Sequence, residues 1–241
     1  MIDYLTVLYR NYDLLDLQLD NFNRRFSNQD YRLIVVDNTP DNEKKEIQRS
    51  CEIDTLIKLD SVSTFDGISH GNAIDVGLQY CKSNIVCIFD SDFFFLHSNI
   101  NDYVEKKFND GYSAVGCSWD DGDGTRYWTK KFPEKFDNIP CAFGAFYDID
   151  LAKSSSWIIT SQEVNENKSE GFIEVGWRIR KNILENQNKT MSWKTDSTYY
   201  GNCIFKDEFD SVMGIHYVAG SHRRWNSQTY ADINKIIREE Y

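Results

Sequence analysis

The segment Ile85-Val86-Cys87-Ile88-Phe89-Asp90-Ser91-Asp92 decides the fold, because it joins a short apolar run to two carboxylates. A continuous apolar run of this length is typical of a strand that is covered on both faces of a parallel sheet. The carboxyl ends of such strands line the ligand-binding crevice of open α/β sheets. Two carboxylates at that edge favour a Mg²⁺ or Mn²⁺ site. The alternative is a solvated turn that happens to contain two aspartates, and the surrounding sequence has to decide between them.

The sequence before this strand alternates between strand and helix patterns. Three short apolar runs predict strands at 4–9, 31–36 and 55–59. Leucines and phenylalanines at helical spacing predict an amphipathic helix over 12–26, and a polar helix is expected over 41–50. Another helix is expected to begin at Gly71-Asn72. This alternation predicts an α/β fold with a central, mostly parallel sheet flanked by helices.

In the second half of the chain, strand and helix patterns alternate less regularly. Helices are expected over 99–109, 173–186 and 227–240, and strands over 112–118, 142–147 and 214–218. The chain contains no internal repeat, low-complexity tract or linker. We therefore expect one domain over residues 1–241.

The composition is that of a globular protein, with 41% hydrophobic and 27% charged residues. The formal net charge of −11 argues against a nucleic-acid polymer as partner, because phosphate backbones require clustered Lys and Arg. No apolar stretch reaches the roughly 18 residues of a membrane span, and the N-terminus does not resemble a signal peptide. The six cysteines are scattered without a C-x-x-C pair, which indicates free thiols in a reducing compartment. We expect a soluble, cytoplasmic protein without a transmembrane segment.

Further polar residues follow the predicted strands. Asp37 ends the second strand, where a carboxylate can accept a hydrogen bond from a nucleobase, although an Asx turn with Asn38 explains it equally well. Asn72 stands at an expected helix start, where free N–H groups favour a phosphate, but Asn is also an ordinary N-cap. Asp90 and Asp92 would face the same crevice.

In this order, the motifs resemble those of the GT-A-fold glycosyltransferases, close to family 2. The resemblance rests on Tyr-Arg-Asn at 9–11, Val-Val-Asp-Asn at 35–38, Gly-Ile-Ser-His-Gly-Asn-Ala at 67–73 and Phe-Asp-Ser-Asp at 89–92. It covers roughly the first hundred residues and implies that residues 1–95 bind a nucleotide-sugar, whereas 96–241 face the acceptor. The implied donor-binding residues are Tyr9, Asn11, Asp37, His70, Asn72, Asp90 and Ser91. The family's usual Asp-Asp-Gly-Ser after the second strand is Asp-Asn-Thr-Pro at 37–40 here, which leaves the donor base and sugar open.

The second half adds matches to the same family. Glu174, in the stretch Glu-Val-Gly-Trp-Arg, resembles the base that activates the acceptor in this family. Glu170 is the rival candidate for this role. A purely structural alternative for Glu174 is that it compensates the dipole of the helix that follows. His216 resembles the late histidine that completes a metal shell with Asp90 and Asp92. Arg223 and Arg224 are candidates to bind the leaving diphosphate, although a solvated basic pair explains them equally well.

The resemblance implies a metal-dependent glycosyltransferase that moves a sugar, with a UDP-sugar favoured, to a glycan or other hydroxyl acceptor with inversion. Mn²⁺ or Mg²⁺ is the expected cofactor. Two alternatives remain at this point. A sugar nucleotidyltransferase would carry a glycine-rich phosphate loop after the first strand, where this chain reads Leu-Tyr-Arg-Asn. A non-catalytic carbohydrate-binding protein could retain the same fold.

Overall fold

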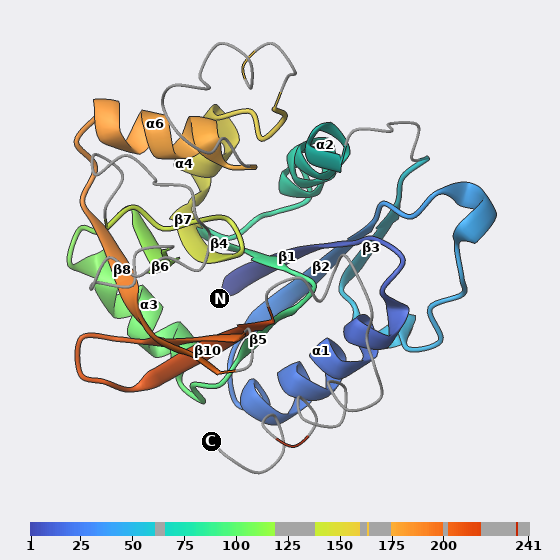
Figure 1. Cartoon of the computed structure of the whole chain (residues 1–241), viewed down its shortest axis with the longest axis horizontal. Coiled ribbons are helices and arrows are strands. Elements are labelled where there is room, and N and C mark those ends of the chain that lie inside the picture. The colour runs from blue at the N-terminus through green and yellow to red at the C-terminus, as the bar shows by residue number, and fades with distance from the viewer. Residues whose placement is uncertain are drawn as a thin grey trace.

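The computed structural model of the chain describes residues 1–60, 66–118, 138–159, 163, 175–199, 202–217 and 235. Within these residues, ten strands form one sheet in the order β3-β2-β1-β4-β7-β6-β8-β9-β10-β5 (Figure 1). The strands are β1 (Ile2–Leu8), β2 (Tyr31–Asp37), β3 (Thr55–Lys58), β4 (Ile85–Asp90), β5 (Phe93–Phe95), β6 (Ala114–Cys117), β7 (Gly144–Asp148), β8 (Thr190–Tyr199), β9 (Asn202–Lys206) and β10 (Val212–Tyr217).

The first four strands form the parallel part of the sheet. β1 lies in the middle and pairs in parallel with β2 and β4, and β2 pairs in parallel with β3. Every residue of β1 is buried, as expected for a strand with helices on both of its faces. The predicted α/β fold is confirmed, and the four predicted strands of the first half are present within a few residues of their expected ends.

Helices cover both faces of the sheet. On one face, α1 (Tyr12–Arg25) and α3 (Ile100–Asn109) bury Phe22 and Val104 in an aromatic-rich core. On the other face lie α2 (Asp66–Leu78), α4 (Ile149–Ser154) and α6 (Trp177–Glu185), whose core includes Ile74 and Ile179 (Figure 1). The chain is thus a three-layer α/β arrangement. None of the helices in the described part of the chain is long and apolar enough to cross a membrane.

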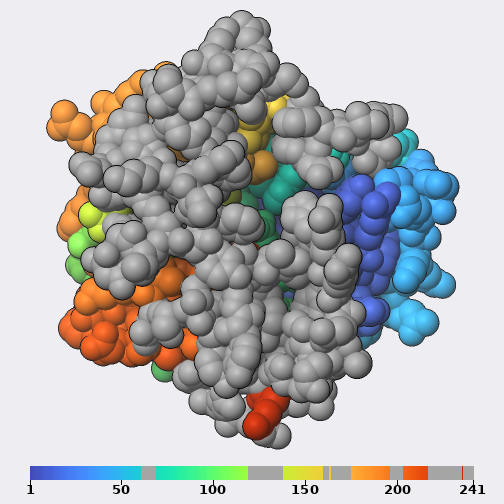
Figure 2. Space-filling model, viewed as in Figure 1, coloured from blue at the N-terminus to red at the C-terminus, as the bar shows by residue number. Residues whose placement is uncertain are grey.

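The second half adds an antiparallel part. β7 runs antiparallel between β4 and β6, and β8 pairs in parallel with β6. β8, β9, β10 and β5 are then antiparallel to one another in that order. β5, β8 and β9 were not predicted from the sequence, whereas β6, β7 and β10 were. In the space-filling view, the surface formed by the start of the chain (blue) and the surface formed by the region of the β9–β10 hairpin (orange) lie on opposite sides of the molecule (Figure 2).

Two helix predictions in the first half were wrong. Instead of a helix over 41–50, the chain forms two short 3₁₀ turns, Asp41–Glu43 and Ser50–Glu52, because this polar stretch has no apolar stripe to bury. The next helix begins at Asp66, so Gly71 and Asn72 lie inside α2 and not at its N-terminus. A glycine occurs at position 71 for a steric reason, because a Cβ atom there would lie 2.1 Å from the carbonyl oxygen of Trp157.

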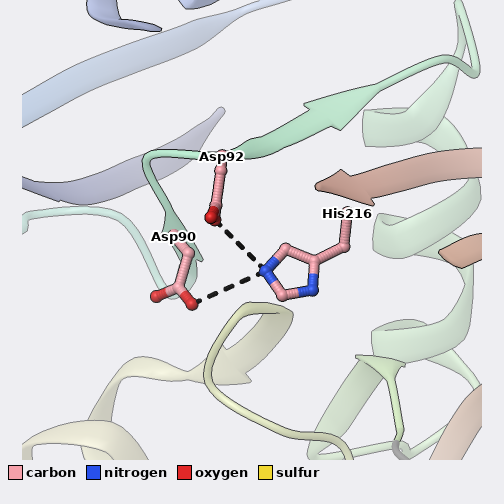
Figure 3. Close-up of side chains that lie close together, drawn as sticks. All are labelled: Asp90, Asp92 and His216. Atoms are coloured by element: carbon pink, nitrogen blue, oxygen red, sulfur yellow. Dashed lines mark hydrogen bonds and ion pairs between the residues drawn. The ribbon is translucent and has the colours of Figure 1, made fainter. Parts of the chain in front are cut away.

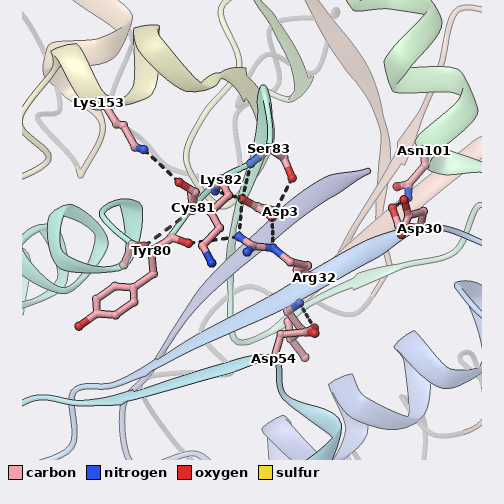
Figure 4. A network of polar contacts seen from close by, with 12 residues as sticks. Asp3, Asp30, Arg32, Asp54, Tyr80, Cys81, Lys82, Ser83, Asn101 and Lys153 are labelled. Carbon is pink, nitrogen blue, oxygen red and sulfur yellow. Dashed lines mark hydrogen bonds and ion pairs between the residues drawn. The ribbon is translucent and has the colours of Figure 1, made fainter.

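A buried polar network closes the opposite end of the sheet from Asp90 (Figure 4). Asp3 at the start of β1 is fully buried and accepts two hydrogen bonds from the guanidinium of Arg32 on β2, at 2.8 and 2.9 Å. The same carboxylate accepts hydrogen bonds from the backbone N–H groups of Lys82 and Ser83 and from the Ser83 hydroxyl. Asp3 therefore joins β1, β2 and the connection between α2 and β4.

The cysteines are free, as the sequence predicts. Cys51 is exposed and the other five are buried, and no disulfide joins them. Burial raises the pKa of the Cys81 thiol to about 12, so this thiol is protonated and unreactive at neutral pH.

Candidate metal and donor site

Asp90 and Asp92 flank a tight turn between two strands. Asp90 is the last residue of β4, Ser91 and Asp92 form the turn, and β5 begins at Phe93. The Asp90 side chain is 31% exposed, whereas that of Asp92 is only 2% exposed. The two carboxylates of the motif therefore differ: Asp90 borders solvent and Asp92 is enclosed.

His216 on β10 lies against both carboxylates (Figure 3). Its Nε2 atom is 3.2 Å from Asp92 Oδ1 and 3.8 Å from Asp90 Oδ2. One potential ligand atom from each of the three residues lies within 4.8 Å of the other two. Among the described residues, this is the only group of three or more His, Cys, Asp or Glu side chains that are close enough together to hold a metal ion. Residues 124 positions apart thus meet at the edge of the sheet.

Aromatic rings enclose the His216 side chain. Phe143 stacks on the imidazole with a centroid distance of 4.7 Å and an interplanar angle of 18°. Phe93 lies 6.4 Å away, tilted by 35°. Rings on two neighbouring segments therefore restrict the rotation of the imidazole, whose Nε2 atom faces the carboxylates.

The residues of α2 approach the same place from the other side of Asp90. His70 Nε2 lies 3.9 Å from Asp90 Oδ1, and the side chain of His70 is 35% exposed. Asn72 is exposed, two positions further along the helix. Ser69 accepts a hydrogen bond from the side-chain amide of Asn38, which links α2 to the end of β2. The structure thus brings His70 to Asp90, whereas Asn72 is exposed on the same helix.

Asp37 ends β2 beside the predicted donor residues of the loop after β1. It is fully buried, with Oδ2 accepting a hydrogen bond from the Tyr12 hydroxyl and Oδ1 from the backbone N–H of Thr39. The Tyr12 oxygen also accepts a hydrogen bond from the Lys45 backbone. Because a carboxylate offers about four lone-pair positions, Asp37 retains capacity for another donor.

The loop after β1 is tied to the loop after β2. The backbone N–H of Arg10 donates to the Thr39 hydroxyl at 2.9 Å, and Arg10 has a φ of 66°, which is uncommon for a residue other than glycine. The Arg10 guanidinium lies over the Tyr9 ring. Tyr9 and Asn11 are both partly buried beside this contact. The predicted donor residues Tyr9, Asn11 and Asp37 therefore belong to one pair of joined loops.

Four predicted site residues lie outside the described residues: Glu170, Glu174, Arg223 and Arg224. In the described part of the same segment, Glu163 pairs with Arg178 of α6 at 2.7 Å.

The sequence interpretation missed two residues that shape this site. Tyr12 was only the first residue of the helix predicted over 12–26, although its position three residues after Tyr9 places it beside the loop that follows β1. Phe143 lies in the strand predicted over 142–147, and its stacking on His216 depends on a tertiary contact that no local pattern indicates.

The potential metal-ligand atoms at the end of β4 determine which cations they can bind. Two carboxylates and one imidazole form a mixed oxygen and nitrogen set, which suits Mn²⁺ and also accommodates Mg²⁺ through the carboxylates. The side chains therefore fit the divalent cation that the sequence predicts.

Comparison with known proteins decides the family. The model of the family described as glycosyl transferase family 2 matches residues 6–151, which is more than half of the 241 residues and includes both aspartates. The chain belongs to glycosyl transferase family 2. None of the curated proteins matches it in sequence.

Solved glycosyltransferases share the fold of this family 2 chain at low sequence identity. Residues 1–349 of S. aureus TarS, in complex with UDP-GlcNAc, superpose with a TM-score of 0.52 and 11% identity over 98% of this chain and 65% of that chain. The galactosyltransferase LgtC, in complex with donor and acceptor sugar analogs, superposes with a TM-score of 0.50 and 12% identity over 76% of this chain and 70% of that chain. The chain spans only 30% of another S. aureus TarS structure. These similarities support the GT-A fold.

Proposed function

We propose that the protein transfers a sugar from a nucleoside-diphosphate sugar to an acceptor hydroxyl, with Mn²⁺ or Mg²⁺ held directly by Asp92 and His216 and supported by Asp90 from the outer shell. The observation that carries this proposal is the convergence of these three side chains at the end of β4, in a chain of glycosyl transferase family 2. A bound divalent cation would stabilise the negative charge that develops on the leaving nucleoside diphosphate.

The three side chains have different duties in this proposal. Asp92 and His216 lie 3.2 Å apart and are enclosed, so they are the direct ligands. Asp90 is partly exposed and lies between His216 and His70, so it faces the donor and orients the ribose or a water molecule. Ser91 completes the turn that separates the two carboxylates.

The donor nucleotide is proposed to lie along the joined loops after β1 and β2. Asp37 accepts a hydrogen bond from the base, with Tyr9 and Asn11 beside it. His70 and Asn72 approach the ribose and phosphates from α2. Uridine is the preferred base, in keeping with the family resemblance and with the UDP-GlcNAc bound by the S. aureus neighbour of the same fold.

The acceptor side of the proposed reaction depends on a carboxylate. Glu174, or alternatively Glu170, removes the proton of the acceptor hydroxyl, which then attacks the anomeric carbon and inverts it. General base assistance of this kind contributes roughly 10²–10⁴-fold to the rate. Arg223 and Arg224 bind the departing diphosphate, because guanidinium groups pair with phosphate oxygens in a bidentate manner.

The proposal is tested by release of nucleoside diphosphate from a panel of nucleotide-sugars, with Mn²⁺ or with EDTA. UDP release that depends on Mn²⁺ and disappears in Asp92→Asn supports it. Asp54→Asn is the matched control, since Asp54 is exposed and its carboxylate accepts a hydrogen bond from the backbone N–H of Leu33, away from the site. Absence of metal-dependent release and of a metal-dependent thermal shift with every donor contradicts the proposal.

A further inference from the structure

Phe93 connects the two enclosed ligands of the candidate metal site. It follows Asp92 directly in the chain and lies opposite His216 in the register of β5 and β10. Because side chains alternate along a strand, Phe93, Phe95, Gly214 and His216 share one face. The Phe93 side chain is fully buried, with its ring beside the imidazole.

Two glycines leave room for the Phe93 ring. A Cβ atom on Gly214 of β10 would lie 2.4 Å from Phe93 Cζ, and one on Gly144 of β7 would lie 2.7 Å from Phe93 Cε2. Neither glycine has a positive φ, so a turn conformation does not explain them. Their lack of a side chain instead lets the ring pack directly on two backbones.

We infer that Phe93 is a positioning residue: seated between Gly144 and Gly214, it holds the backbone of Asp92 against β10 and keeps Asp92 and His216 in one fixed geometry. Phe143, the neighbour of Gly144, stacks on the imidazole from its own segment. A displacement of the Phe93 ring would therefore move the turn that carries Asp92 relative to the strand that carries His216. This inference rests on the proposed metal site and assigns it a supporting residue.

The rigid pair also has a consequence for metal selectivity. Ca²⁺ accepts 6–8 oxygen ligands in flexible geometries at about 2.3–2.6 Å, whereas smaller cations require shorter and more regular coordination. A nitrogen ligand in a fixed position favours Mn²⁺ over Ca²⁺. Loosening the Phe93 ring should therefore weaken Mn²⁺ binding more than Ca²⁺ binding.

The test compares two leucine substitutions on the same strand. Phe93→Leu removes the ring between the glycines, and Phe95→Leu is the matched control. Phe95 is also fully buried on the same face. Its ring meets the edge of Phe93 at 5.0 Å and packs on its other sides against Tyr4 and Phe146, whereas the ring next to the imidazole is that of Phe93. Calorimetric titration of each full-length variant with Mn²⁺ and with Ca²⁺ measures the affinities, and thermal unfolding measures the loss of stability.

We expect a similar drop in Tm for both variants, because each removes one ring from the same core. Phe93→Leu should lower Mn²⁺ affinity by about tenfold and reduce the preference for Mn²⁺ over Ca²⁺, since a supporting residue of a metal site is typically worth 10–100-fold. Phe95→Leu should bind both cations like the wild type. Gly144→Ala, which displaces the Phe93 ring without changing it, should reproduce the effect of Phe93→Leu and serves in its place if that variant does not fold.

Wild-type Mn²⁺ affinity and selectivity in Phe93→Leu or Gly144→Ala would overturn the inference and leave the metal site intact. Equal losses in Phe93→Leu and Phe95→Leu would also overturn it, because general loosening of the core would then be sufficient. Failure of the wild type to bind Mn²⁺ would instead refute the metal site itself, and this inference with it.

Discussion

Replacement of Asp3 by Asn tests how the end of the sheet opposite the candidate site is held. The carboxylate is fully buried and accepts hydrogen bonds from Arg32, Lys82 and Ser83. An Asn side chain has one acceptor oxygen, and each oxygen of Asp3 accepts a hydrogen bond from Arg32. The amide group of Asn would therefore face a guanidinium N–H in either orientation, together with either the Ser83 hydroxyl or the two backbone N–H groups. Hydrogen bonds to charged groups contribute about 1.5–3 kcal/mol each, and loss of one partner of a buried ion pair costs about 3–5 kcal/mol.

From these contacts we expect Asp3→Asn to lower the free energy of unfolding by about 3 kcal/mol at pH 7. Urea unfolding followed by circular dichroism measures this difference. Asp54→Asn serves as the control and should change stability by less than about 0.5 kcal/mol, since Asp54 is exposed.

The pH dependence of this difference has a definite sign. Burial alone would raise the pKa of Asp3, but the hydrogen bonds from Arg32, Ser83 and Lys82 outweigh it and lower that pKa below its ordinary value. The unfolded chain therefore binds a proton at a higher pH, near about 4, than the folded chain does. The stabilisation by Asp3 is complete above that pH and is lost as the pH falls through the folded pKa.

The gap between wild type and Asp3→Asn should accordingly be constant from pH 7 to about pH 5 and shrink below about pH 4. A difference smaller than about 1 kcal/mol at pH 7, or one that stays constant as the pH falls to about 3, would refute this reasoning.

Three further substitutions test the site and its supports. Asp92→Ala should weaken binding of Mn²⁺ with UDP by more than about a hundredfold and Asp90→Ala by about tenfold, because loss of a direct ligand exceeds loss of an outer contact; equal losses by calorimetry would contradict this division of roles. Tyr12→Phe removes the hydroxyl that donates to the carboxylate at the end of β2, and should cost about 1 kcal/mol of stability and weaken binding of UDP but not of pyrophosphate; parallel losses of both ligands would argue against a role for this carboxylate at the base. Gly71→Ala should cost about 1–3 kcal/mol in thermal unfolding, because its Cβ would overlap the backbone of the segment after α4; an unchanged Tm would contradict the close approach.

The parallel part of the fold was predictable because its strands carry their own signal. β2 and β4 each contain a continuous apolar run, Leu33 to Val36 and Ile85 to Phe89, and β1 is apolar except for Asp3 and Thr6. The amphipathic helix α1 separates β1 from β2. Such strands are buried on both faces, so their local sequence and their final environment agree. Asp90 and Asp92 could be placed at the sheet edge from the apolar run that precedes them.

The antiparallel part was harder to predict because it depends on distant pairing. β8 contains five consecutive polar residues, from Lys194 to Thr198, and β5 has only three residues, Phe93–Phe95. Neither segment was recognised as a strand from the sequence. Gly71 illustrates a different limit of prediction. A glycine is required there because the backbone of Trp157, more than 80 residues away, approaches it closely, and the sequence alone therefore suggested a helix start.

The candidate metal site lies where the parallel and antiparallel parts of the sheet meet, so its residues come from both parts. β4 brings Asp90 out of the parallel part, and the turn through Asp92 leads into β5, which pairs with β10. His216 faces the carboxylates only in this register, because a shift of one residue would turn its side chain to the opposite face of the sheet. Phe93, held between glycines of β7 and β10, is the contact that resists such a shift. The motif that the sequence shows at 90–92 is therefore half of a site, and the packing that selects the β5–β10 register supplies the other half.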